Sequence, residues 1–105
     1  MSYKQETIEE IASQNDLFRG LCACPVMTQG ALMLEPFELI QAVRKFNDFN
    51  KDNDPYGEHD FGSLDWHGVK VFWKIDYYDA SLSEGRSPLD DDCQRVLTIM
   101  RADEY

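Results

Sequence analysis

The segment from Asn53 to Asp79 carries residue types that could do acid–base chemistry. Glu58, His59 and Asp60 are consecutive, and the strand pairing predicted below places Asp76 opposite His59. A carboxylate beside an imidazole orients the ring and selects one tautomer, as general-base catalysis requires. One interpretation is therefore a small hydrolase-like or metal-assisted enzyme centred on His59. The other is a structural hydrogen bond that closes a hairpin, because catalysis also needs a pocket.

The loop before this segment partly matches a calcium-binding loop. Asn50–Asp54 places oxygen ligands at alternate positions, but proline then stands where that loop needs glycine, and phenylalanine where it needs its closing glutamate. An irregular hard-cation site using Asp52, Asp54 and Glu58 is one alternative. The other is a turn-rich loop in which Asn and Asp side chains bond backbone groups. We predict no metal and no cofactor.

The three cysteines do not form a convincing metal or disulfide pattern. Cys22 and Cys24 are spaced C-x-C, and Cys93 is far away in the sequence, whereas structural zinc sites have paired C-x₂₋₄-C motifs. An odd number of cysteines is also a poor disulfide framework and is typical of a reducing compartment. These residues are predicted to be free thiols that pack as small apolar side chains.

Net charge is the strongest compositional signal. The chain has 20 acidic and 10 basic residues and a formal net charge of −10. Six acids and four bases precede Asp48, and fourteen acids and six bases follow from there. Such a surface repels nucleic acid and favours a basic partner, although excess charge can also serve solubility alone. We therefore expect no direct nucleic-acid binding.

Length and composition indicate one soluble domain over residues 1–105. Hydrophobic residues make up 43% of the chain, which is ordinary for a globular protein. No apolar run approaches the length of a membrane span, and the first residues lack the pattern of a signal peptide. We expect a cytoplasmic protein that does not bind membranes.

Two helices and two isolated strands are predicted from local patterns. The first helix covers Lys4–Phe18, begins at a capping box formed by Ser2 and Gln5 or by Thr7 and Glu10, and ends at Gly20. A second helix starts at Pro36, a favoured first-turn position, and continues to Lys45. Short strands are predicted at Val26–Thr28, which a turn follows, and at Arg95–Met100.

A β-hairpin is predicted around a turn at His67-Gly68. This turn places Trp66 opposite Val69 and puts Trp73 over the bare backbone of Gly62. The full register pairs Leu64 with Val71, Asp65 with Lys70, Ser63 with Phe72, Phe61 with Lys74 and His59 with Asp76. The fold class is therefore α+β: two helices packed on one face of a small, mainly antiparallel sheet with a central hairpin, in the order α-β-α-β-β-β.

Several blocks of the sequence resemble a known family. NDPYGEHDFG, FWKIDYYD, RVLTIM and the terminal EY are similar to the signature blocks of a family of small uncharacterised bacterial proteins, a domain of unknown function. The resemblance runs from the first helix to the C-terminus. It implies a bacterial origin, a single small domain and carriage on mobile elements, but it assigns no catalytic residue. Cys22, Cys24 and Cys93 are not part of the family pattern.

These observations lead to one functional expectation and its alternatives. We expect a non-enzymatic acidic protein that binds a basic protein surface, such as that of a nucleic-acid-binding protein, as an inhibitor or DNA mimic. The alternatives are the enzyme centred on His59 and an oligomer built through a sheet edge; the oligomeric state is left open. The residues predicted to contact the partner combine acids with exposed aromatics: Asp48, Asp52, Asp54, Tyr56, Glu58, Asp60, Phe72 and Tyr78.

Overall fold

The predicted hairpin forms, and its register is as predicted from Phe61↔Lys74 to Trp66↔Val69. In the computed structural model, which describes residues 4–52, 54–90 and 92–105, strand β2 (Phe61–Trp66) pairs antiparallel with β3 (Val69–Tyr78). The partners Trp66↔Val69 and Gly62↔Trp73 are confirmed. His67 and Gly68 both have positive φ, at 53° and 85°, as the tightest hairpin turns require.

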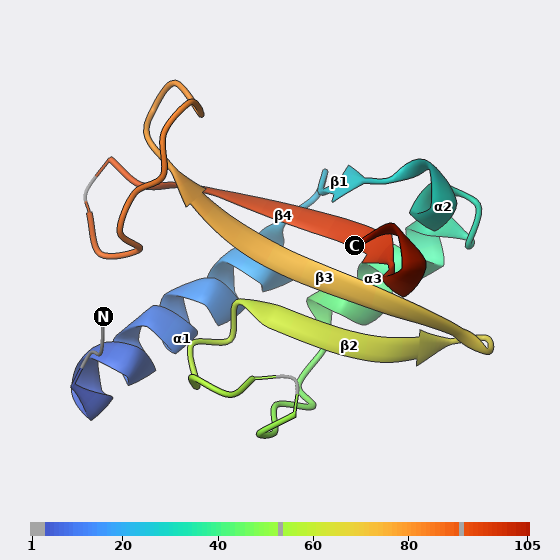
Figure 1. Ribbon diagram of the computed structural model, residues 1–105, viewed down its shortest axis with the longest axis horizontal. Coiled ribbons are helices and arrows are strands. Elements are labelled where there is room, and N and C mark those ends of the chain that lie inside the picture. The colour runs from blue at the N-terminus through green and yellow to red at the C-terminus, as the bar shows by residue number, and fades with distance from the viewer. Residues whose placement is uncertain (1–3, 53, 91) are drawn as a thin grey trace.

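The sheet is mixed rather than purely antiparallel. Its strand order is β1-β4-β3-β2, so β2 of the hairpin lies at an edge. Strand β4 (Gln94–Arg101) pairs antiparallel with β3, whereas the short β1 (Val26–Met27) pairs parallel with β4 (Figure 1). The hairpin was predicted to be central, but its strand β2 is an edge strand of the sheet.

The described residues form three α-helices where two were predicted, and the ends of α1 differ from the prediction. Helix α1 (Gln5–Leu21) and helix α3 (Pro36–Arg44) form where predicted, but a short α2 (Gln29–Leu32) stands between β1 and α3. The predicted order is wrong at this point, because Thr28 caps a helical turn by accepting a hydrogen bond from the Ala31 N–H. A 3₁₀ turn, η1 (Ala102–Glu104), follows β4.

The predicted ends of α1 are only partly correct. Lys4 is the N-cap and provides no side-chain hydrogen bond, Thr7 lies inside the helix, and Ser2 is outside the described residues. The helix continues past Gly20 to Leu21. Arg44 Nε donates to the Gly20 carbonyl at 2.9 Å. A side chain of α3 thus satisfies one of the last carbonyls of α1, which have no partner within the helix.

The core lies between the helices and one face of the sheet. In Figure 1 α1 passes behind β3 and β4, and α3 passes behind β3. Trp73 is fully buried, and a Cβ atom added at Gly62 would collide with its indole ring, so only glycine fits there. Strand alternation points Val71, Trp73, Ile75, Leu97 and Ile99 to this face of the sheet. They form one buried core with three side chains from the helices: Ala31, Leu39 and Val43.

Candidate functional site

His59 lies on the helix side of the sheet and does not pair with Asp76. Strand β2 begins at Phe61, and His59 has a positive φ of 56° that turns the chain before the strand starts. The imidazole Nδ1 is 2.9 Å from Asp16 Oδ1, and Nε2 is 3.5 Å from Asp54 Oδ2. The predicted His59–Asp76 pair is wrong, since Asp76 is paired with Lys74 on the opposite face, at 2.9 Å.

Aromatic stacking holds the His59 ring in place. Phe49 lies parallel to it, with ring centroids 3.7 Å apart and an interplanar angle of 2°. Phe49 in turn meets Phe46 and the buried Trp73 edge to face. His59 therefore connects the loop after α3 to the core and to Asp16 of α1.

A second polar network is centred on Asn15, which is fully buried in α1. Its Nδ2 donates to Tyr77 Oη at 2.8 Å and to the Glu58 carbonyl at 3.0 Å, and its Oδ1 accepts from Arg95 Nε at 2.8 Å. No sequence motif predicted a role for Asn15. The available signal was its position four residues after Ile11, on the apolar stripe of α1, where a polar side chain needs a partner.

The acids beside these networks have perturbed ionisation. Burial raises the pKa of Asp60, and the nearby Asp54 carboxylate adds to the effect. Burial also raises the pKa of Glu58, helped by Asp60 and Asp54. The pKa of Tyr77 is raised as well, mainly by burial. Burial thus makes the charged forms of Glu58 and Asp60 more costly than they would be at exposed positions.

The residues predicted to contact a partner fall into three groups by exposure. Asp48, Asp52 and Tyr56 are exposed, and the Tyr56 side chain is 78% accessible. Asp54 is buried, where its Oδ1 accepts from the His59 backbone N–H at 3.1 Å. The remaining members are half-buried: Glu58, Asp60, Phe72 and Tyr78. Asp54 therefore stabilises the loop, and its carboxylate does not belong to the contact surface.

The cation alternative finds no geometric support among the described residues. In that part of the chain no three His, Cys, Asp or Glu side chains are grouped so that they could hold a metal ion. Asn50 Oδ1 accepts from the Asp52 backbone N–H at 2.9 Å, which is the turn chemistry considered above. Asn53, within the predicted ligand run, lies outside the described residues.

The cysteines are free thiols. Cys24 is exposed, while Cys22 and Cys93 are half-buried and line one hollow between α1 and the start of β4. Burial raises the pKa of both Cys22 and Cys93. Both therefore remain protonated at neutral pH, and neither has the lowered pKa of a reactive thiolate.

The second face of the sheet carries an aromatic cluster beside a hollow. We call this side, which bears Phe61, Phe72 and Tyr78, the open face. The rings of Phe61 and Phe72 are 5.1 Å apart, and Tyr105 meets both edge to face. A hollow of about 290 Å³ adjoins them, with this lining: Asn50, Asp52, Phe61, Ser63, Lys70 and Phe72. Two of the residues predicted to contact a partner, Asp52 and Phe72, thus line the same hollow.

Many positive side chains are paired or turned inward. Arg19 is 4% exposed, and Arg95 donates to Asn15 and Gln14. Three further cations form ion pairs with neighbouring carboxylates: Lys74 with Asp76, Arg86 with Asp92 and Arg101 with Asp103. Each of these pairs neutralises one carboxylate together with one cation, so the net charge of −10 is unchanged, and Asp48 and Asp52 are among the exposed acids.

The fold is a small α+β fold with a mixed four-stranded sheet, and the chain has a formal net charge of −10. The family model described as "Protein of unknown function (DUF3768)" matches residues 26–104, from β1 to η1. The chain belongs to this family. The match begins after α1, so the first helix, which the resemblance included, is outside it.

No curated protein and no solved structure matches the chain. Among the described residues, no helix has both the length and the apolar composition that a membrane span needs.

Proposed function

We propose that this protein is a non-enzymatic, acidic interaction protein that binds a basic protein surface. The observation that carries the proposal is the distribution of charge. The chain has a net charge of −10, and much of its positive charge is buried or paired internally. Excess surface charge of one sign attracts a partner of the opposite sign and speeds its association at low salt.

The contact surface runs from the loop after α3 to the open face of the sheet. The exposed acids Asp48 and Asp52 supply charge, and the exposed Tyr56 supplies an aromatic anchor. Phe72 and Tyr78 extend the surface along β3. Aromatic side chains surrounded by charged groups are the usual centres of protein interfaces.

The form we favour is an inhibitor that mimics DNA. Its carboxylates would occupy a channel that normally holds phosphates in a nucleic-acid-processing or defence complex. A bacterial, cytoplasmic setting and carriage on a mobile element fit this form, because such elements gain by blocking host enzymes that act on DNA. The bacterial origin, the cytoplasmic location and the carriage on a mobile element are themselves proposed.

Partner capture at two salt concentrations tests the proposal. The immobilised protein is exposed to bacterial lysate at about 50 mM and about 200 mM salt, and bound proteins are identified by mass spectrometry. We expect basic nucleic-acid-binding proteins at low salt, fewer at high salt, and release by a DNA duplex added as competitor. Capture that neither salt nor DNA changes would contradict the proposal.

Single substitutions locate the surface. Tyr56→Ala and Asp52→Asn should each weaken the captured complex about tenfold, equivalent to about 1.4 kcal/mol. Phe37→Ala is the matched control, because Phe37 is 80% exposed but lies on α3, away from the loop. Equal losses from Tyr56→Ala and Phe37→Ala, measured by surface plasmon resonance, would place the contact elsewhere.

An enzyme centred on His59 is the second candidate, favoured by the raised pKa values of Glu58 and Asp60. The geometry supports it less well. Both imidazole nitrogens face carboxylates, and the ring is stacked on Phe49. Neither the hollow beside Phe61 and Phe72 nor the hollow between α1 and β4 is lined by His59. Turnover of p-nitrophenyl esters or phosphates that His59→Gln abolishes would favour the enzyme.

A further inference from the structure

The first half of β4 has an unoccupied edge. On one side β4 pairs with β3 along its full length, from Gln94 to Arg101. On the other side β1 pairs with Thr98 and Ile99 alone. Among the described residues, no strand or isolated bridge pairs with Gln94–Leu97 on that side. An edge of this kind presents backbone groups to which another strand can add.

The register identifies which backbone groups face this edge. The Thr28 N–H donates to the Ile99 carbonyl at 3.1 Å, so Ile99 points its backbone polar groups towards β1. Residues two apart in a strand point the same way. The N–H groups of Arg95 and Leu97 therefore face the free edge, whereas those of Gln94 and Val96 face β3.

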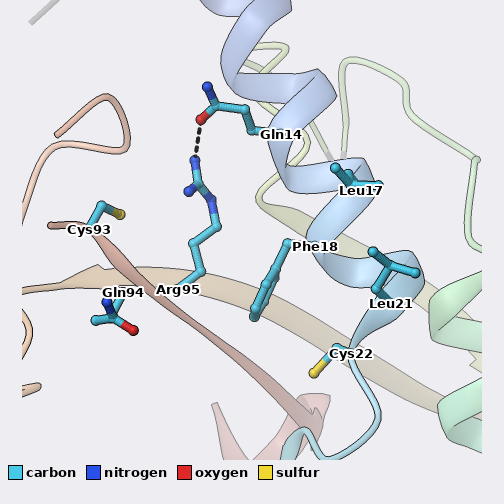
Figure 2. Close-up of a pocket in the computed structure, with 8 residues that line it drawn as sticks. All are labelled: Gln14, Leu17, Phe18, Leu21, Cys22, Cys93, Gln94 and Arg95. Atoms are coloured by element: carbon cyan, nitrogen blue, oxygen red, sulfur yellow. Dashed lines mark hydrogen bonds between the residues drawn. The ribbon is translucent and has the colours of Figure 1, made fainter. Parts of the chain in front are cut away.

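An apolar groove lies directly beside this edge. Figure 2 shows it between α1 and the start of β4, with Leu17, Phe18 and Leu21 on the helix side and Gln94 and Arg95 on the strand side. Its volume is about 520 Å³. Leu17 and Leu21, one helical turn apart, are 66% and 69% exposed. Such exposure is costly for leucine unless a partner covers it.

The rim of the groove is acidic. Glu10, two helical turns before Leu17, accepts from Gln14 Nε2 at 3.4 Å, and Asp90 is exposed just before β4. Asp92 is also exposed there and is paired with Arg86 at 3.2 Å. The cation in the lining, Arg95, is turned inward: it donates to Asn15 and Gln14, and its guanidinium lies 5.4 Å from the Tyr77 ring centre. Glu10 and Asp90 therefore contribute negative charge near this end of the groove.

We propose that an extended segment of a partner protein, with apolar residues alternating with lysine or arginine, adds as a strand to this edge of β4. Its backbone bonds Arg95 and Leu97. Alternate apolar side chains enter the groove over Leu17 and Leu21, and the basic side chains between them, which point away from α1, are attracted by the net charge of −10. A second copy of this chain fits poorly, because it has the same net charge of −10.

This strand-addition site is separate from the contact surface proposed above. The groove lies on the helix side of the sheet, whereas Phe72 and Tyr78 lie on the open face. Peptide recognition by strand addition draws its affinity from backbone hydrogen bonds and its specificity from pockets for alternate side chains. Both components are present at this edge.

A random peptide display library, with variable segments of about ten residues, tests the inference. We expect enrichment of sequences that alternate apolar and basic residues. The best peptide should bind the double variant Leu17→Gln, Leu21→Gln at least about tenfold more weakly, while Phe37→Gln binds it normally. Enrichment of no sequence class, or binding that the double variant retains, would overturn the site.

Amide hydrogen exchange then tests the geometry. Binding of the selected peptide should slow exchange at Arg95 and Leu97 by about tenfold or more, with smaller changes at Gln94 and Val96. Unchanged exchange at Arg95 and Leu97 would exclude strand addition. Tyr56→Ala should leave peptide binding intact, so this test can succeed or fail independently of the proposed function. A neutral-pH dimer that blocks peptide binding would assign the edge to a second copy and overturn the inference.

Discussion

At the scale of single residues, the most consequential side chains are buried polar groups. Asn15 joins α1, the loop carbonyl of Glu58 and β3 through hydrogen bonds of 2.8 to 3.0 Å. His59 joins the same loop to Asp16 and Phe49. Satisfied buried polar groups are costly to disrupt, because removing one partner leaves the other without a hydrogen bond. They specify how the acidic loop lies on α1.

The raised pKa of Asp60 predicts a pH-dependent gain from Asp60→Asn. Burial favours the protonated carboxyl in the folded state, so between its ordinary value of 3.8 and its raised folded value the native protein binds more protons than the unfolded chain. This residue therefore lowers the free energy of unfolding as pH rises through that window. Asparagine has no such penalty.

We expect Asp60→Asn to be more stable than the wild type at about pH 7 and the advantage to shrink as pH falls towards about 4. Urea unfolding at several pH values measures this difference. Asp52→Asn, at an exposed position, is the control and should change little. An Asp60→Asn advantage that grows in acid would contradict the assignment.

At the scale of elements, α1 and α3 satisfy each other's C-termini. Arg19 of α1 donates to the Val43 and Phe46 carbonyls at 3.1 and 2.8 Å, and Arg44 of α3 donates to the Gly20 carbonyl. Cations at helix C-termini also interact favourably with the helix dipole. Each helix thus ends where the other provides a donor, which explains why α1 passes Gly20.

Removing these two arginines should have unequal effects. Arg19→Met should lower the free energy of unfolding by about 2–4 kcal/mol, because Arg19 is buried, bonds two carbonyls and pairs with Asp16 at 3.2 Å. Arg44→Met loses its bond to Gly20 and should cost about 1 kcal/mol. Urea titration measures both, with exposed Lys45→Met as the control. Equal costs for all three variants would show that the reciprocal caps contribute nothing.

At the scale of the whole molecule, charge sets behaviour in solution. A net charge of −10 on a 12.2 kDa chain produces mutual repulsion between copies, although no strand among the described residues pairs with the first half of β4 on its outer edge. Charged surfaces are one means by which proteins protect sheet edges from self-pairing. A basic segment experiences attraction at the same edge.

Self-association should therefore depend on pH. At about pH 7.5 and low salt we expect static light scattering to give the mass of a single chain. Near the sequence pI of about 4.4 the repulsion disappears, and we expect association. A stable dimer at neutral pH would contradict this expectation and would favour the alternative of an oligomer built through a sheet edge.

Local patterns in the sequence determined much of the architecture. Alternating side chains and a two-residue turn were sufficient for the hairpin register, including Gly62 opposite Trp73, because strand alternation has a strict period of two. The positions of α1, α3 and β4, and the acidic character, also follow from local sequence. The short α2 did not, since its capping signal at Thr28 stands within an apolar run that contains Gly30.

The tertiary structure alone decided which distant residues meet. The sequence could not show that His59 contacts Asp16 or that Asn15 donates a hydrogen bond to Tyr77. Nor could it show that β1 pairs with β4 at Thr98 and Ile99. All of these contacts join segments that are far apart in the chain. Their geometry depends on how helices pack across the sheet, which packing of the entire core determines. For the same reason, Asp54 is a buried support of the loop, and the groove beside β4 is visible only in the folded chain.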